Sequence, residues 1–451
     1  MEPWWIPPLR EVVGDRDVVI AGAVPAAWNE HADQLRAAGA RSLLVVATEG
    51  RGAGTGPDVP TVVVEAPEGM GTMERLRFGL RGLESPPPEV VAALDEFDPS
   101  GEAVVVGAFL NTSPDLAGRP FLAHRRPEWV ALEDKVVVDE FWDRAGVARL
   151  PTAVCALEEA PAVAPAIDRG SGTVWAGDAR EGFHGGGVHT HWVVDGASAD
   201  AALDDLTRSC DRVRVMPFVD GIACSIHGIV LPDGVVALRP VELVTLRSGT
   251  DLHYAGCATY WDPPDSVRVQ MREIARQVGA RLREEVSFRG TFTVDGVADA
   301  DGFWPTELNP RYGAGINAIG KANADLPIML LNDLIVSGRP IGRSATELEA
   351  ELVERADATR AGGTWSVQSR PVDPVERSVT RRGDGWVWAG EGDPVDGHVV
   401  AGNSFVLCRF NADRIPVGPS VGPLAESFWA FADREIGTGL GPLTAPLDTT
   451  R

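Results

Sequence analysis

The stretch of this sequence with the clearest chemical content is WPTELNPRYGAG, at residues 304–315. Side chains on a β-strand alternate between its two faces, so Glu307, Asn309 and Arg311 would project together from one face. Asp295 precedes this run and is separated from it by the turn-forming sequence ADADG. Two antiparallel strands joined by that turn would bring Asp295 to the same face.

Two carboxylates and one amide oxygen are hard ligands that suit Mg²⁺, which keeps phosphate oxygens and waters in its remaining positions. A guanidinium beside them can stabilise the charge of a transferring phosphoryl group. The simpler alternative is a solvated edge strand that carries a chance salt bridge. The motif therefore favours a phosphoryl-transfer site without excluding that alternative.

A glycine-rich run, Gly182–Val188, lies between two strand-like runs, Thr173–Trp175 and Thr190–Val194. Glycines allow backbone N–H groups to approach phosphate oxygens without obstruction by side chains. A flexible β-turn is the alternative explanation of the same residues. The pattern is compatible with a loop that covers phosphates.

The apolar run Val213–Gly221 ends in a turn. Such a segment can form a flat slot whose free backbone groups bind an adenine, although runs of this kind are more often ordinary core.

The elements that position these residues follow from the hydrophobic pattern. Four short apolar runs alternate with helical segments near the N-terminus: Asp17–Ala21, Arg41–Ala47, Thr61–Glu65 and Ala103–Val106. This order predicts a parallel sheet with helices on its faces. The turn after the first run lacks the spaced glycines of a dinucleotide fingerprint, so no nicotinamide cofactor is expected.

Composition narrows the classes of partner. The chain has 451 residues, a formal net charge of −24 and a pI near 4.7, which argues against nucleic acid or an anionic membrane as partner. Five scattered cysteines without zinc spacing and the absence of a secretion signal or apolar span favour a cytoplasmic protein. Its only lysines are Lys135 and Lys321, among 41 basic residues. A lysine retained in an arginine-rich chain suggests a need for a compact point charge.

In this order, the elements resemble the ATP-grasp superfamily. The resemblance rests on a Rossmann-like start, Asp134-Lys135 before a helix, the glycine loop, the apolar hinge strand and Asp295 with the ELNPR run. It implies an α/β and α+β chain with an N-terminal Rossmann-like pre-ATP-grasp domain (1–130), an ATP-grasp domain (131–340) and a small C-terminal α+β domain (341–451). Within the ATP-grasp part, it implies an ATP-binding subdomain at about 150–220 and a metal-binding subdomain at about 221–340.

The resemblance also implies the role of each matching residue. Asp295, Glu307 and Asn309 would hold Mg²⁺, and the catalytic Arg311 would hold an acyl phosphate. ATP would be bound by residues of the lysine, the glycine loop and the hinge: Lys135, His184, Gly185, Gly186, Gly187, Met216, Pro217, Phe218 and Val219. The cofactors expected are ATP and Mg²⁺.

One position departs from the family pattern. Members of the family usually carry a lysine on the strand before the glycine loop, where this chain has Ala176 in TVWAGDAR. Three explanations remain open: an arginine such as Arg180 replaces the lysine, the protein is a degenerate nucleotide binder, or the alignment is shifted. We expect the first, because the metal-binding set is complete.

Four further residues are candidates for contact with substrate. Arg239, Glu242 and Arg247 lie on or beside the hairpin that leads towards the metal strands, and structural ion pairs are the alternative for them. Tyr254, followed by Ala255-Gly256, could border the substrate pocket, and a plain loop is the alternative there.

The function that the resemblance implies is an ATP-dependent carboxylate–amine (peptide) ligase that forms an amide bond through an acyl phosphate. The GDAREGFHGGG loop and the extra C-terminal domain look most like the peptide ligases of peptide-antibiotic pathways, of the pheganomycin type. Its partners would be small carboxylates and amines or peptides, and a homodimer is compatible with this class. Two alternatives are an impaired ATP-binding or regulatory protein and an ATP-dependent phosphotransferase.

Overall fold

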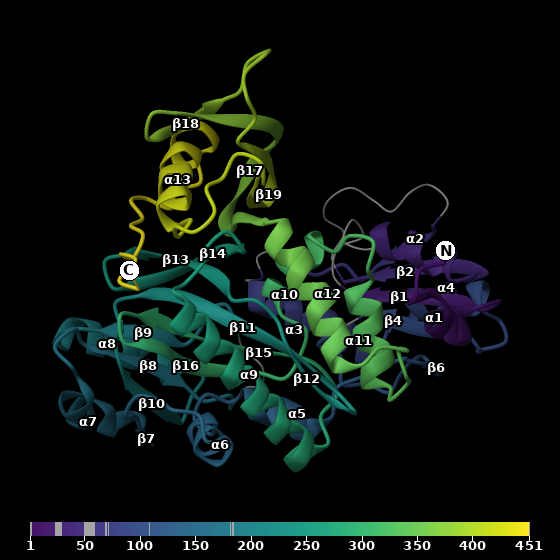
Figure 1. The fold of residues 1–451 in the computed structure, drawn as a ribbon, viewed down its shortest axis with the longest axis horizontal. Coiled ribbons are helices and arrows are strands. Elements are labelled where there is room, and N and C mark those ends of the chain that lie inside the picture. The colour runs from purple at the N-terminus through teal and green to yellow at the C-terminus, as the bar shows by residue number, and fades with distance from the viewer. Residues whose placement is uncertain are drawn as a thin grey trace.

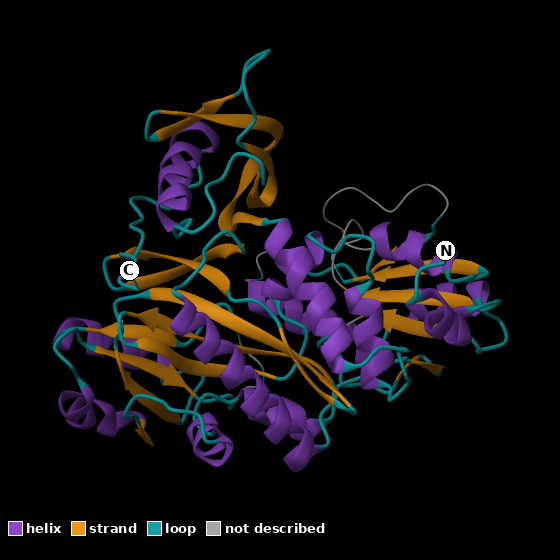
Figure 2. Ribbon diagram, in the orientation of Figure 1, coloured by secondary structure: helices purple, strands orange, loops and turns teal. Residues whose placement is uncertain are grey.

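The computed structural model describes residues 2–22, 29–48, 59–67, 70, 72–107, 109–180, 182 and 185–450. In this part of the chain, three large sheets and one small hairpin are covered by helices (Figures 1 and 2). None of the helices in these ranges is both long and apolar enough to span a bilayer.

The N-terminal sheet is parallel and has the strand order β3-β2-β1-β4. Its strands are β1 (Asp17–Gly22), β2 (Ser42–Ala47), β3 (Thr61–Val63) and β4 (Val104–Gly107). Alternate residues of β1 enter different cores: Val18 and Ile20 pack with α1 (Ile6–Val13) and α2 (Asn29–Ala37), whereas Val19 and Ala21 pack with α3 (Thr72–Glu84) and α4 (Pro88–Phe97). Burial of both faces explains the continuous apolar runs, and the predicted parallel sheet is confirmed.

A connecting region then carries the hairpin β5 (Asp115–Leu116) and β6 (Arg119–Pro120), the helix α5 (Pro127–Val130), the 3₁₀ turn η2 (Ala131–Glu133) and α6 (Val138–Ala145). The next sheet is antiparallel, with the order β7-β10-β8-β9. Its strands are β7 (Ala153–Ala156), β8 (Thr173–Gly177), β9 (Thr190–Val193) and β10 (Arg212–Pro217). The 3₁₀ turn η3 (Leu157–Glu159), α7 (Ala160–Ile167) and α8 (Gly196–Leu206) supply the apolar side chains that pack with it.

The largest sheet has the order β16-β15-β11-β13-β14-β17-β18, with β12 on β11 and β19 on β17. Its strands before residue 310 are β11 (Ile222–Leu231), β12 (Gly234–Ala237), β13 (Val241–Ser248), β14 (Asp251–Ala258), β15 (Gly290–Asp299) and β16 (Gly302–Asn309). The long helix α9 (Asp265–Val286) packs on one face through Met271, Val278 and Leu282. The helices α10 (Ala314–Lys321), α11 (Ile328–Val336) and α12 (Ala345–Ala358) lie between this sheet and the N-terminal sheet (Figure 1).

The C-terminal part consists of β17 (Gly362–Arg382), β18 (Gly385–Trp388), β19 (Gly397–Phe410) and α13 (Gly422–Ile436). It is built around its own aromatic core, in which Trp386, Phe428 and Trp429 are buried. The strand β17 also pairs with β14, so this part continues the large sheet.

Glu242 connects the large sheet to α13. Its buried carboxylate accepts hydrogen bonds from the Ser420 hydroxyl and from the backbone N–H groups of Val421 and Gly422, at the start of the helix. Burial raises the pKa of Glu242 from 4.5 to about 7 although these hydrogen bonds oppose the shift. The folded protein therefore retains this proton at a pH where the unfolded chain has lost it.

Glu242→Gln tests this linkage. Because the pKa is raised in the folded state, the contribution of Glu242 to stability is complete below pH 4.5 and is lost as the pH rises through 7. The full shift corresponds to at most about 3 kcal/mol. Thermal unfolding at pH 5 and pH 8 should therefore show a smaller loss of Tm in the glutamine variant than in the wild type. Equal losses in the two proteins would contradict the raised pKa.

Candidate active site

A cavity of about 400 Å³ lies between two sheets. One is the antiparallel sheet of β7, β8, β9 and β10, called the small sheet below, and the other is the largest sheet, called the large sheet. This volume falls in the range of small-molecule sites. The small sheet contributes Ala176, Thr190, Arg214 and Met216, and the large sheet contributes residues of β11 and β13–β16.

The floor of the cavity is made by alternate residues of adjacent strands. Asp295 pairs with Glu307 across β15 and β16, and Thr293 pairs with Asn309. The register shifts between Asp295 and Gly296, so Thr306 is the extra residue of a β-bulge. The bulge allows the two carboxylates to lie opposite each other, as the sequence predicted, while Leu308 faces the core below.

The two carboxylates create a strongly negative floor. Burial raises the pKa of Asp295, and the neighbouring Glu307 raises it further, while Arg311 and a hydrogen bond from Asn309 act in the opposite direction. Within the described residues, no N–H or O–H group donates a hydrogen bond to the Glu307 carboxylate. A floor with this excess of negative charge is suited to a cation.

Asn309 and Arg311 connect this pair to the rest of the cavity wall. The Asn309 amide nitrogen donates to Asp295 Oδ2 at 2.9 Å, and Arg311 Nη2 donates to Asn309 Oδ1 at 2.9 Å. The predicted metal set is thus two carboxylates and one amide. The described chain contains no cluster of three or more His, Cys, Asp or Glu residues that could hold a metal, so the site would depend on the amide and on substrate oxygens for its remaining ligands. The donor types and the uncompensated charge fit a hard divalent cation such as Mg²⁺.

The predicted phosphate-binding residues lie across the cavity from this floor. Gly185, Gly186 and Gly187 line it, and the last two have φ values of 66° and 81°, in the region that favours glycine. Buried Lys135 also lines the cavity and donates from Nζ to Thr190 Oγ1 at 3.3 Å. The predicted residue His184 lies outside the described residues.

The hinge residues Met216, Pro217, Phe218 and Val219 all line the cavity, as predicted for an adenine slot. Phe218 stacks on Trp192 with ring centroids 3.9 Å apart. The Arg247 guanidinium covers Phe218 at 5.0 Å and donates to Asp220 at 2.7 Å. Arg247 and the half-buried Tyr254 both line the cavity, so these two substrate candidates lie where the sequence suggested.

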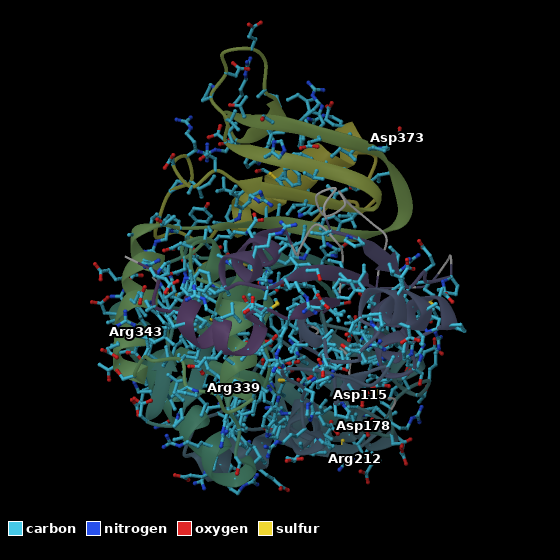
Figure 3. The ribbon with its side chains drawn as sticks, turned by 90° about the vertical axis from the view of Figure 1, so that its right-hand side faces the viewer. Asp115, Asp178, Arg212, Arg339, Arg343 and Asp373 are labelled. Atoms are coloured by element: carbon cyan, nitrogen blue, oxygen red, sulfur yellow. The ribbon has the colours of Figure 1, made fainter. Side chains whose placement is uncertain are left out.

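The expected replacement of the lysine at Ala176 does not lie at the cavity. Arg180 donates to Asp211 at 2.7 Å and to the Arg208 carbonyl, and it does not belong to the described lining. Asp178, directly after β8, forms an ion pair with Arg212 at the start of β10, and the two residues lie close together in Figure 3. Arg180 extends beyond the end of β8, which explains why it bonds there.

The residue directly opposite Ala176 is Arg214 of β10. Arg214 is almost completely buried, lines the cavity, and binds both oxygens of Asp139. A third contact runs from Arg214 Nη1 to the Thr306 carbonyl at 2.8 Å. The cation beside Ala176 is therefore a paired arginine of the next strand.

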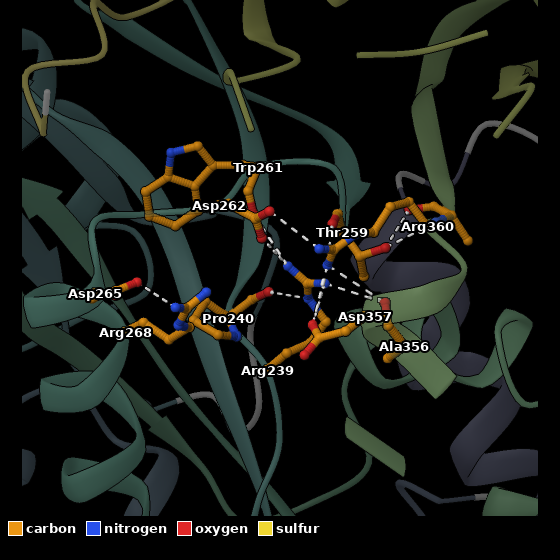
Figure 4. Close-up of polar contacts among 11 residues, drawn as sticks. Arg239, Pro240, Thr259, Trp261, Asp262, Asp265, Arg268, Ala356, Asp357 and Arg360 are labelled. Atoms are coloured by element: carbon orange, nitrogen blue, oxygen red, sulfur yellow. Dashed lines mark hydrogen bonds and ion pairs between the residues drawn. The ribbon is translucent and has the colours of Figure 1, made fainter. Parts of the chain in front are cut away.

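Two other substrate candidates do not reach the cavity. Arg239 is buried between Asp262 and Asp357 and joins the start of β13 to the end of α12 (Figure 4). Glu242 pairs with Cys224 on the face of the sheet opposite to Ser225, so strand alternation directs it towards α13. Both residues have structural partners, which was the alternative that the sequence left open.

Sequence reasoning missed several residues of the lining. Ser225, His227 and Thr293 form a hydrogen-bonded chain, and burial lowers the pKa of His227 to about 3, so it is neutral. Their alternation on β11 and β15 could have indicated them. Pro446 also lines the cavity, and no local pattern marks it.

No known protein-family profile and no curated protein sequence matches this chain. Solved structures do match over most of its length. The chain has the ATP-grasp fold. The likeness includes the phosphoribosylamine–glycine ligase of Thermotoga maritima (TM-score 0.52, 16% identity, 96% of this chain and 99% of that one) and the L-amino acid ligase of Bacillus licheniformis (0.51, 14%, 94% and 98%).

A third similar structure is the biotin carboxylase domain of the Hydrogenobacter thermophilus 2-oxoglutarate carboxylase, solved with MgADP, ADP and bicarbonate (TM-score 0.56, 12% identity, 87% and 86%). At these identities the likeness shows the fold, including the N-terminal Rossmann-like domain and the small C-terminal domain.

Gly315, in the first turn of α10, should be intolerant of a side chain. A Cβ atom there would lie 2.1 Å from His227 Nε2, whereas at Gly320 of the same helix the nearest atom is 3.8 Å away. We expect Gly315→Ala to destabilise the fold by about 1–3 kcal/mol through overpacking. Gly320→Ala should stabilise it by up to about 1 kcal/mol through helix propensity. Denaturant unfolding measures both, and equal effects would contradict the close packing on His227.

Proposed function

We propose that this protein is an ATP-dependent carboxylate–amine ligase, which forms an amide bond through an acyl phosphate. The observation that carries the proposal is the pairing of Asp295 with Glu307 beside Asn309 and Arg311, across one cavity from Lys135 and the glycine loop. The ATP-grasp fold supports it, since similar structures include two ligases of this kind and one MgADP complex.

In this proposal, a substrate carboxylate oxygen attacks the γ-phosphorus of ATP, and ADP leaves. The amine nitrogen then attacks the acyl carbon, phosphate leaves, and the nitrogen gives up its proton. Asp295, Glu307 and Asn309 would hold Mg²⁺, which supplies charge neutralisation at the phosphates. Such chemistry needs mainly positioning and electrostatic stabilisation, which a fixed set of charged groups provides.

Each wall of the cavity takes one part of the substrates. Lys135 and the backbone of the glycine loop bind phosphates, and the slot at Met216–Val219 takes the adenine. Arg311 orients the carboxylate and stabilises the transferring phosphoryl group. The uncharged lining residues Leu243, Thr245 and Tyr254 take the body of an amino acid or a peptide. We extend the proposal to peptide natural-product biosynthesis on the resemblance of the glycine loop and the extra C-terminal domain.

Release of ADP tests the reaction class. The wild type, given Mg-ATP with pools of acids and amines, should release ADP only when both pools are present, together with a product of amide mass. Glu307→Gln and Asn309→Ala should each lower this turnover about 100-fold or more, because each removes stabilisation of charge that develops in the transition state. Binding without turnover would instead indicate an impaired nucleotide binder, and a stable phosphorylated product would indicate a phosphotransferase.

Two basic residues should differ in their effect on nucleotide binding. Lys135→Ala removes a buried charge at the cavity and should weaken the binding of MgADP at least tenfold, about 1.4 kcal/mol. Arg180→Ala removes a charge that is paired with Asp211 outside the described lining, so it should change Kd less than twofold. Calorimetric titration measures both. A large loss of MgADP affinity in the Arg180 variant would instead indicate that Arg180 replaces the missing lysine.

A further inference from the structure

Behind the cavity wall, a buried glutamate lies between two arginines from different parts of the chain. Glu133, at the end of η2, accepts a hydrogen bond on Oε1 from Nη2 of Arg125. The same oxygen forms an ion pair with Nε of Arg311 at 3.2 Å. The exposed fractions of the Glu133, Arg125 and Arg311 side chains are 6%, 7% and 14%. The nucleotide-binding roles described above make no use of Glu133 or Arg125.

The contacts form a continuous polar path. It starts in the connecting region, where the Arg125 backbone N–H donates to the Asn111 carbonyl. It runs through Glu133 to Arg311, which donates to Asn309, and Asn309 in turn donates to Asp295. Arg125, which is far from Asp295 in the sequence, is thereby linked to the floor by successive contacts.

The charges of this path explain why a glutamate stands at its centre. Burial lowers the pKa of Arg125, and the positive charge of Arg311 lowers it further, whereas Glu133 raises it. Two buried guanidinium groups that repel each other need a shared counter-charge. Without Glu133, the acidic groups nearest to Arg311 along the path are those of the floor, Asp295 and Glu307. Arg311 would then be drawn onto the cation site.

We propose that Glu133 is a positioning residue that holds Arg311 at the edge of the carboxylate floor, with Arg125 as the second partner that fixes Glu133. This inference rests on the proposed function. Glu133 acts through Arg311 and contacts neither nucleotide nor substrate. Lys135, two residues after Glu133, would bind the phosphates directly. One short segment therefore supplies both a phosphate-binding residue and the residue that positions Arg311 at the floor.

Glu133→Gln tests the role because it keeps the shape of the side chain and an acceptor oxygen but removes the charge. The assay uses an acid accepted by the wild type, Mg-ATP, and hydroxylamine, which attacks the acyl phosphate and gives a hydroxamate and phosphate. We expect kcat to fall at least tenfold, while the KM for Mg-ATP changes less than threefold, because the nucleotide-binding residues are untouched.

Asp396→Asn is the matched control. Asp396 is also a buried carboxylate between two arginines, Arg381 and Arg414, but it lies in the C-terminal part, directly before β19. Its loss should lower Tm and leave kcat unchanged. If Glu133→Gln behaves like this control in an active wild-type background, the positioning role is overturned and the proposed function stands.

A double variant separates positioning from folding if Glu133→Gln lowers Tm severely. Adding Arg125→Met removes the excess positive charge, so Tm should recover, but kcat should remain at least tenfold low because Arg311 still lacks its ion pair. Recovery of kcat together with Tm would show a purely structural role. A wild type that activates no acid overturns the proposed function itself, and the inference with it, a result visible without any variant.

Discussion

The structure of the cavity depends on one strand pairing, that of β15 with β16, which places two half-buried carboxylates side by side. Charges are costly to remove from water unless they are paired or bound to a metal. The raised pKa of Asp295 expresses that cost. Three groups around the floor offset this cost. Asn309 lies between the Asp295 carboxylate and the Arg311 guanidinium, and Lys135 acts on Asp295 from another element.

These positive groups come from separate elements, so the site exists only when the sheets are assembled. Lys135 precedes α6, Arg311 follows β16, and Arg214 lies on β10. Arg214 bound to Asp139 contributes no net charge, whereas Lys135, the other cation on this side of the cavity, donates to a neutral hydroxyl.

Local sequence patterns predicted most of the fold and the floor of the site. Continuous apolar runs predicted the parallel sheet because both faces are buried, and alternation placed Glu307 beside Asn309. Alternation failed at the bulge, where Thr306 adds a residue and brings Trp304, rather than Pro305, to the face of Glu307. Alternation places Glu242 and Arg247 on opposite faces of β13, but it could not tell which of them faces the cavity, because the pairing of β11 with β13 decides this. Ion pairs such as those of Arg180 and Arg239 depend on partners distant in sequence, which no local pattern reveals.

The C-terminal residues show how far such long-range contacts extend. The backbone of Thr444 pairs in both directions with Arg247 of β13, the Thr449 hydroxyl donates to the Asp220 carbonyl, and Pro446 lines the cavity between them. The same end of the chain is tied to α13, since the Ala445 N–H donates to Glu426. Paired strands of the large sheet form the floor of the cavity, whereas residues 444–449 form this edge of it. Because a fold does not determine substrate choice, we expect substitutions at this edge to change what the cavity accepts without disturbing the paired carboxylates of the floor.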